Sequence, residues 1–156
     1  MNITVIAIGK IKETYFRESI NEYIKRLSSY CSLKIVEIPS EPIFDEKDYK
    51  KYKQNEAKKI LQYLNTNSYI ITLEIEGKQL SSPDLAQKIK DISNDGYNEL
   101  TLIIGGANGP DDDISIKTDF KLSFSKMTFT HQMIRVILLE QIYRAFKILN
   151  NENYHR

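Results

Sequence analysis

The sequence predicts an α/β protein with a parallel sheet and helices on both of its faces. Short runs rich in β-branched residues alternate with longer segments whose apolar residues recur at helical spacing. This alternation is typical of strand–helix units that build a parallel sheet. The 156 residues suit a single domain, residues 1–156, with a sizeable core. No stretch reaches the ~20 apolar residues of a membrane helix.

Five strands are expected from the apolar runs. Four of them lie in the first two thirds of the chain, at residues 2–9, 33–39, 69–75 and 100–106. The fourth run, LTLIIGG, is the most apolar, which favours a central place in the sheet. A short fifth strand is expected at KLSFS, residues 121–125.

Helices are expected in the segments between these runs. Ser82, Pro83 and Asp84 are typical of a helix start, with Ser82 as the cap. A polar, lysine-rich loop from residue 40 to residue 54 is expected to precede the second helix, and its lysines to form a solvated face. The expected helices are 13–29, EAKKILQYL, 82–93 and 131–149.

Composition excludes several kinds of chemistry. Cys31 is the only cysteine, so the chain forms no internal disulfide and no cysteine-based metal site. A reducing cytoplasm is its expected location. The two histidines and scattered acids predict no metal site, and the chain has no HExxH, GxSxG or GK[ST] motif. Hydrolytic and metal-dependent chemistry are therefore poorly supported.

Three strand ends carry residues suited to a ligand, and ligands of open α/β sheets bind beyond the carboxyl ends of strands. The first is Leu73-Glu74, and the second is the pair Gly105-Gly106, which allows close approach of the backbone. This glycine turn does not match the dinucleotide pattern GxGxxG, and the acidic run 111–113 would repel a pyrophosphate.

The third marked strand end is LSFSKMTFTHQ, residues 122–132. Its hydroxyl, aromatic and methionine side chains can surround a flat heterocycle. Alternatively, Ser125, Thr128 or Thr130 caps the helix that follows. Both roles are compatible.

The last helix is apolar on nearly all sides, which predicts burial all round. We expect it to face the core on one side and a second copy of the chain on the other, as a homodimer; a central helix in a monomer is the alternative. His131 and Arg135 lie one turn apart at its start and are weaker catalytic candidates. Glu140, Arg144 and Lys147 share one face and predict an ion pair.

The chain ends in Tyr154, His155 and Arg156. An aromatic ring, an imidazole and a guanidinium can stack on or hydrogen-bond to a nucleobase, and the guanidinium can hold a phosphate. Residues 117–156 carry seven Lys/Arg against three Asp/Glu, although the whole chain has a net charge of only +1. This distribution is compatible with a phosphate-bearing partner or with ordinary scatter of surface charge.

Five stretches together resemble one family. The stretches are ITVIAIGKIKE, ITLEIEGKQLSS, IIGGANG, LSFSKMTFTHQMIRVILLEQIYRAFKIL and the terminal YHR. In this order and over the whole chain, they resemble the bacterial large-subunit ribosomal RNA pseudouridine N3-methyltransferases, small enzymes of the SPOUT class.

The resemblance implies a SPOUT-type parallel sheet with a deep trefoil knot near the C-terminus. It implies S-adenosylmethionine as cofactor, at positions matching Leu73, Gly105 and the stretch Phe124, Ser125, Lys126, Met127, Thr128 and Phe129. The implied substrate is N3 of a pseudouridine in the 23S rRNA hairpin loop that reaches the decoding centre, within the assembled 70S ribosome. The implied enzyme is a homodimer.

Two positions depart from the family pattern. Thr130 stands where proline is frequent, and it can cap the helix without loss of activity. The acidic run 111–113 is expected to face away from RNA.

The C-terminal Tyr154, His155 and Arg156 are expected to cover the cofactor pocket of the other subunit and hold the target base, with His155 and Arg156 as candidates to assist deprotonation. The alternatives are another nucleotide-binding α/β enzyme and a non-catalytic ribosome-binding factor.

Overall fold

The computed structural model describes every residue except 41, 43–44, 107–108 and 155–156. Its five strands are all parallel and lie in the order β2-β1-β4-β3-β5. The strands are β1 (Asn2–Ile8), β2 (Ser32–Ile38), β3 (Tyr69–Gln79), β4 (Glu99–Ile104) and β5 (Phe120–Ser123). The predicted parallel sheet and the central place of the fourth strand are therefore confirmed.

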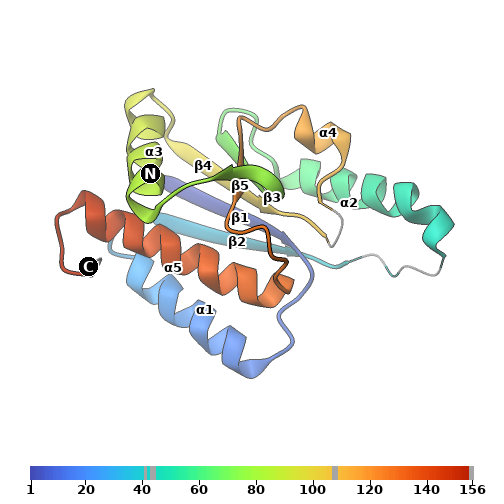
Figure 1. Ribbon diagram of the computed structural model, residues 1–156, viewed down its shortest axis with the longest axis horizontal. Coiled ribbons are helices and arrows are strands. Elements are labelled where there is room, and N and C mark those ends of the chain that lie inside the picture. Colours follow the sequence, from blue (N-terminus) through green and yellow to red (C-terminus); the bar gives the residue numbers. More distant parts are fainter. Residues whose placement is uncertain (41, 43–44, 107–108, 155–156) are drawn as a thin grey trace.

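Helices cover both faces of the sheet, as predicted (Figure 1). They are α1 (Thr14–Leu27), α2 (Tyr49–Tyr63), α3 (Ser82–Asn94), α4 (Asp112–Ser115) and α5 (His131–Leu149), with a 3₁₀ turn η1 (Glu46–Asp48) before α2. Buried residues of α3 and α5 and of α1 join one core cluster, and those of α2 and α4 join a second.

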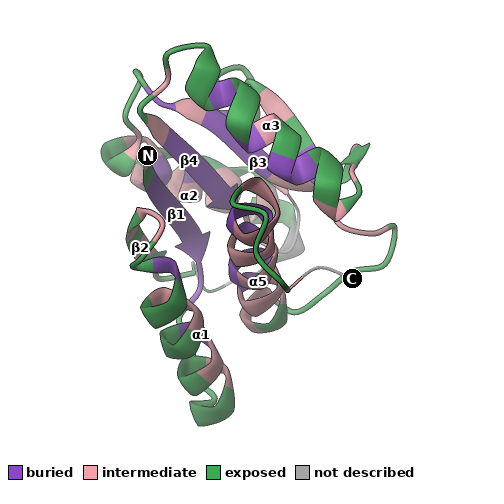
Figure 2. Cartoon of the chain, turned by 90° about the vertical axis from the view of Figure 1, so that its left-hand side faces the viewer, coloured by how far each residue is buried: buried purple, intermediate pink, exposed green. Residues whose placement is uncertain are grey.

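The alternation of side chains along β1 divides the core into these two layers. Ile3, Val5 and Ala7 belong to the first cluster, whereas Ile6 and Ile8 belong to the second. Successive residues of a strand point to opposite faces, so a strand covered on both sides is apolar throughout. Figure 2 shows β1 and β4 buried, while the outer side of α1 is exposed.

Several boundaries differ from the predictions. Ser81, not Ser82, caps α3, because its hydroxyl accepts from the Asp84 amide while the Asp84 carboxylate accepts from the Ser81 amide. The second helix starts earlier, at Tyr49. Helix α4 was not predicted; the side chain of Asp111 caps it by accepting from the Asp113 amide at 3.2 Å. The knot implied by the resemblance stays a prediction.

Candidate functional site

A pocket of about 470 Å³ lies at the ends of β4 and β5, beside the middle of β3 where its pairing with β4 stops. This volume is within the range of sites for small ligands. Its walls come from the ends of the strands, the glycine turn after β4, the loop after β5 and the first turn of α5. The lining residues include Leu73, Glu74, Ile104, Gly105, Gly109, Leu122, Phe124 and His131.

The pocket exists because β3 changes its pairing after Leu73. Leu73 opposite Ile104 is the last pair between β3 and β4, and the β3–β5 register jumps between Leu73 and Lys78. The strand was predicted to end near residue 75, but it continues to Gln79. At Gly77 a Cβ would lie 2.7 Å from the carbonyl carbon of Leu122, so only glycine permits this crossing.

The loop between β5 and α5 is shaped by hydrogen bonds that its serine and threonine hydroxyl groups make with the backbone. The Ser123 hydroxyl donates to the Ser125 carbonyl at 3.1 Å, and the Ser125 hydroxyl accepts from the Met127 amide at 3.0 Å. The Thr130 hydroxyl accepts from the Met133 amide at 3.3 Å and caps α5. Of the three capping candidates, Thr130 is therefore the one that caps the helix.

Two acidic residues, Glu74 and Glu76, line the largely apolar pocket, and Glu74 is the less exposed of them. Glu74 is 16% exposed; it accepts a hydrogen bond from the Thr72 hydroxyl at 2.7 Å and pairs with Lys121 at 3.2 Å. A fixed acceptor among apolar walls is the usual arrangement by which a pocket orients a ligand that carries hydroxyl or ammonium groups.

The structure brings most of the predicted cofactor residues together. The pocket is lined by Leu73, Gly105, Phe124, Ser125, Met127, Thr128 and Phe129. Lys126 of the same loop is exposed and does not line the pocket. The role of all these residues in cofactor binding stays a prediction.

His131 lines the pocket, and its position depends on a glycine at the end of β1. Gly9 has a φ of +94°, and a Cβ built there would lie 3.3 Å from Cδ2 of His131. The imidazole thus packs directly against the backbone of Gly9. The importance of Gly9 was not apparent from the sequence, since the two residues are far apart in the chain.

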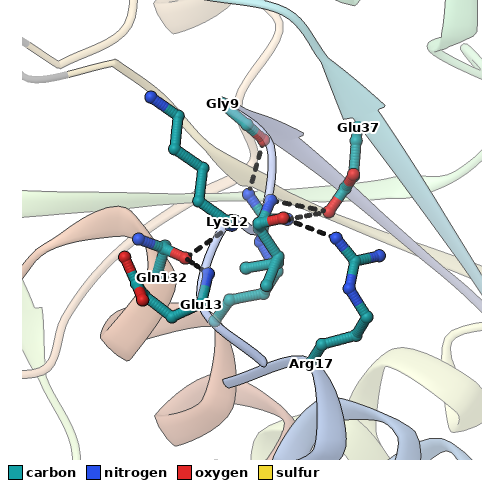
Figure 3. Close-up of polar contacts among 8 residues, drawn as sticks. Gly9, Lys12, Glu13, Arg17, Glu37 and Gln132 are labelled. Atoms are coloured by element: carbon teal, nitrogen blue, oxygen red, sulfur yellow. Dashed lines mark hydrogen bonds and ion pairs between the residues drawn. The ribbon is translucent and has the colours of Figure 1, made fainter. Parts of the chain in front are cut away.

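Arg135 lies outside the pocket lining and is almost fully buried, at 1% exposure. Its Nη1 donates to Glu37 Oε1 at 2.6 Å and its Nη2 donates to the Gly9 carbonyl at 2.9 Å (Figure 3). Burial lowers the pKa of Arg135, and Glu37 opposes that shift. This placement ties the start of α5 to the ends of β1 and β2, and gives no support to a direct catalytic role for Arg135.

Tyr154 follows the end of α5, and its side chain folds back onto the middle of that helix. Its hydroxyl donates to Glu140 Oε1 at 3.2 Å, and its ring centroid lies 4.9 Å from that of Tyr143 and 4.7 Å from Cζ of Arg144. Burial is the main reason that the pKa of Tyr154 is raised. His155 and Arg156 lie outside the described residues.

The ion pair predicted on α5 is present between Glu140 and Arg144. Lys147 was grouped with them, but it pairs with Glu152, which also accepts a hydrogen bond from the Tyr30 hydroxyl at 2.7 Å. Tyr30 in turn stacks on Phe146. Polar and aromatic contacts therefore hold the segment after α5 against its own chain.

The pocket is compatible with S-adenosylmethionine. Its apolar walls suit an adenine ring, and Glu74 offers an acceptor for hydroxyl or ammonium groups. At Gly105 a Cβ would lie 3.3 Å from the backbone of Gly109 and Pro110, so glycine keeps the turn at the pocket compact. Among the described residues, no three His, Cys, Asp or Glu side chains gather as a metal site.

No helix in the described part of the chain is long and apolar enough to cross a membrane.

Comparison with known proteins identifies the class that this fold and pocket define. The model of a family described as predicted SPOUT methyltransferases matches residues 1–155, and the chain belongs to this family. The resemblance to the SPOUT class that was seen in the sequence is thereby confirmed, and so is the SPOUT-type α/β fold.

Named relatives are similar over their whole length. The chain is 53% identical over 161 residues to a putative ribosomal RNA large subunit methyltransferase H from Methanococcus maripaludis (strain C5 / ATCC BAA-1333), with both chains fully covered. It is 50% identical over 159 residues to a ribosomal RNA large subunit methyltransferase H from Clostridium novyi (strain NT), again with full coverage of both.

A solved structure shares the fold at low sequence identity. It is a probable methylase family protein from Haemophilus influenzae Rd KW20, with a TM-score of 0.53 and 15% identity. The match covers 96% of this chain and 66% of that one.

Proposed function

We propose that this protein uses S-adenosylmethionine to methylate N3 of a pseudouridine in 23S rRNA, in the hairpin loop that reaches the decoding centre of the assembled 70S ribosome. The observation that carries the proposal is the pocket at the ends of β4 and β5, beside the middle of β3, in a chain of the SPOUT methyltransferase family. The two relatives named as large-subunit rRNA methyltransferases support the choice of ribosomal RNA. The expected location is the cytoplasm.

In this proposal the pocket walls hold the cofactor and exclude water. Leu73, Gly105 and the loop from Phe124 to Phe129 surround it, and Glu74 accepts hydrogen bonds from its polar groups. The cofactor supplies a methyl group on a sulfonium, which is already electrophilic. The chain's own task is to align the target nitrogen and to assist the loss of its proton.

The C-terminal residues serve a neighbouring subunit's pocket in this proposal. Helix α5 has 19 residues and spans about 28 Å at ~1.5 Å per residue, with His131 at one end and the tail at the other. Figure 1 shows the tail on the side of the molecule where α5 ends, away from where the helix begins. The Tyr154 hydroxyl contacts Glu140, about 14 Å along the helix from His131 at ~1.5 Å per residue, and Tyr154 does not line its own pocket.

A homodimer formed through α5 would let the tail of one subunit reach the pocket of the other. The solvent side of the helix keeps apolar surface, with Ile137 half-buried and Met133 42% exposed. A second, antiparallel copy would cover that surface and bring its tail towards the pocket. There Tyr154 would stack on the target base, and His155 and Arg156 would hold its edge and receive or stabilise the displaced proton.

The test is transfer of labelled methyl groups from S-adenosylmethionine to unmodified 70S ribosomes. The full chain is compared with a chain that stops after Asn153, and cofactor binding is measured for both. We expect the shortened chain to bind cofactor but to transfer methyl about 10²- to 10⁴-fold more slowly, the usual contribution of a positioned acid or base.

The controls separate the parts of this proposal. Equal activity of both chains would remove the tail from the mechanism and leave the function intact. No transfer by the full chain, with binding to ribosomes retained, would favour a non-catalytic binding factor. Thermal stabilisation by NAD in place of S-adenosylmethionine would favour another nucleotide-binding enzyme.

A further inference from the structure

The loop between β1 and α1, residues 9–13, presents two lysines next to the pocket. Along this loop the exposure alternates: Gly9 and Ile11 are buried, whereas Lys10 and Lys12 are exposed. Ile11, at 5% exposure, belongs to the core cluster. The loop is thus anchored inward at Gly9 and Ile11, and both ammonium groups are directed to solvent.

Side chains from three other elements hold the backbone of this loop. The Gly9 carbonyl accepts from Arg135, and the Ile11 amide donates to Glu37 Oε1 at 3.3 Å. Arg17 Nη2 donates to the Ile11 carbonyl at 2.6 Å. Because Arg135 and Glu37 also pair with each other, one connected network fixes the first half of the loop (Figure 3).

Gln132 fixes the second half. Its Oε1 accepts from the Lys12 amide at 2.8 Å and from the Glu13 amide at 3.1 Å. In Figure 3 the Lys12 side chain extends away from this network. The backbone below the ammonium group is therefore restrained while the group itself stays available.

The loop adjoins the pocket through a direct contact. Gly9 packs against His131, which lines the pocket, and Gln132 follows His131 in α5. Lys10 follows Gly9, which contacts the pocket residue His131, and the Lys12 amide is bonded to Gln132, the next residue of α5. The two lysines therefore lie beside the pocket wall, at the same edge of the sheet.

The charge of the segment is positive and not neutralised by its surroundings. Residues 9–17 carry Lys10, Lys12 and Arg17 against the single carboxylate of Glu13. Within the part of the chain that the structure describes, no ion pair joins Lys10 or Lys12 to a carboxylate. In a protein with a net charge of +1, such a local excess needs an acidic partner or solvent.

We propose that Lys10 and Lys12 bind backbone phosphates of the RNA that enters the pocket, and that the loop between β1 and α1 is a rigid platform for these contacts. Phosphates provide most of the affinity in protein–nucleic acid binding and fix the register of the partner. A restrained backbone loses less freedom on binding than a mobile loop does. This inference rests on the proposed methylation of ribosomal RNA.

The test measures kcat/KM for methyl transfer to ribosomes over a series of KCl concentrations at fixed magnesium. The protein carries Lys10→Gln together with Lys12→Gln. A matched control carries Lys25→Gln and Lys34→Gln, which change the charge equally at exposed positions near the end of α1 and on β2. The affinity of each protein for S-adenosylmethionine is measured in parallel.

The slope of log(kcat/KM) against log[KCl] is negative, and loss of each phosphate contact makes it less steep by about 1. We therefore expect the slope of the Lys10/Lys12 variant to be less negative by about 2 and that of the control to be unchanged. Cofactor affinity should stay as in the original protein. An unchanged slope overturns the proposal, and so does a loss of cofactor affinity, which would place the lysines at the cofactor. Absence of methyl transfer by the unmodified protein would instead reject the proposed function.

Discussion

The two ends of helix α5 are held to the rest of the protein in different ways. At its start, Arg135 is 1% exposed and its guanidinium joins the ends of β1 and β2. In its second half, Arg144 pairs with Glu140 at the middle of the helix, the two side chains are 25% and 19% exposed, and the tail adds contacts that water can reach. The first end is fixed within the core, whereas the second rests on contacts at the surface.

This difference suits the roles proposed for the two ends. A buried charge that loses its partner is strongly destabilising, while an exposed ion pair adds little. The pocket end therefore keeps one geometry in the free protein. The tail end can exchange its contacts for others, because Tyr154 leaves a half-exposed cluster and not a sealed core.

Replacing one carboxylate at each end tests this difference most strongly. Glu37→Gln leaves the Arg135 charge buried without a counter-charge, and we expect a loss of about 3 kcal/mol in the free energy of unfolding. Glu140→Gln is the same chemical change beside a partly exposed arginine, and we expect a loss below about 1 kcal/mol. Chemical denaturation of both variants gives the two values. Equal losses would show that the two ends do not differ in the way described.

A smaller loss of stability is expected when Gly9 is replaced by alanine. Gly9→Ala forces alanine to a φ of +94° and directs its Cβ at His131, whereas Gly96→Ala imposes nearly the same φ, +92°, with no atom within 4 Å. Both variants should lose about 1–2 kcal/mol of stability through backbone strain. Only Gly9→Ala should also weaken binding of S-adenosylmethionine, because it displaces a wall of the pocket. Calorimetric titration compares the affinities of the two variants for S-adenosylmethionine. Equal affinities would show that the contact between Gly9 and His131 does not shape the cofactor pocket.

The pocket could be located from sequence because its residues lie in or directly after apolar strands. Gly105 and Phe124 follow β4 and β5, Leu73 is the last residue of β3 that pairs with β4, and ligands of parallel sheets bind at the carboxyl ends of strands. The jump in the β3–β5 register between Leu73 and Lys78 could not be predicted in this way. It depends on Gly77 meeting the backbone of Leu122, and an isolated glycine in a strand does not reveal its neighbour.

The network around Arg135 had no local signal in the sequence. Arg135, one turn from His131, was a weaker catalytic candidate, and the structure places its side chain in the core. Glu37 is 98 residues away in the chain, and in isolation it looks like an ordinary polar residue near the end of a strand. A pair this distant in sequence becomes apparent only in the fold, where α5 packs on β1 and β1 pairs with β2.

The smallest effect concerns pH at the tail end. Hydrogen bonds from Lys147 and Tyr30 lower the pKa of Glu152 below its ordinary value of 4.5. A carboxyl group whose pKa is lowered by folding contributes stability above its ordinary pKa, and the contribution disappears as the pH falls through the lowered value. The segment after α5 should therefore loosen below pH 4.5, while the Arg135 network keeps the pocket end in place.

The amide NMR signals of Tyr154 and Ile134 report on the two ends during an acid titration. In the unmodified protein the Tyr154 signal should move, as the pH falls, towards its position in Glu152→Gln, which lacks the ionised carboxylate at every pH. The Ile134 signal should stay the same in both proteins over that interval. A Tyr154 signal that already coincides with that of the variant at neutral pH would mean that Glu152 does not hold the tail. The tail would then be free before substrate arrives, and its exchange between subunits would need no contact to break.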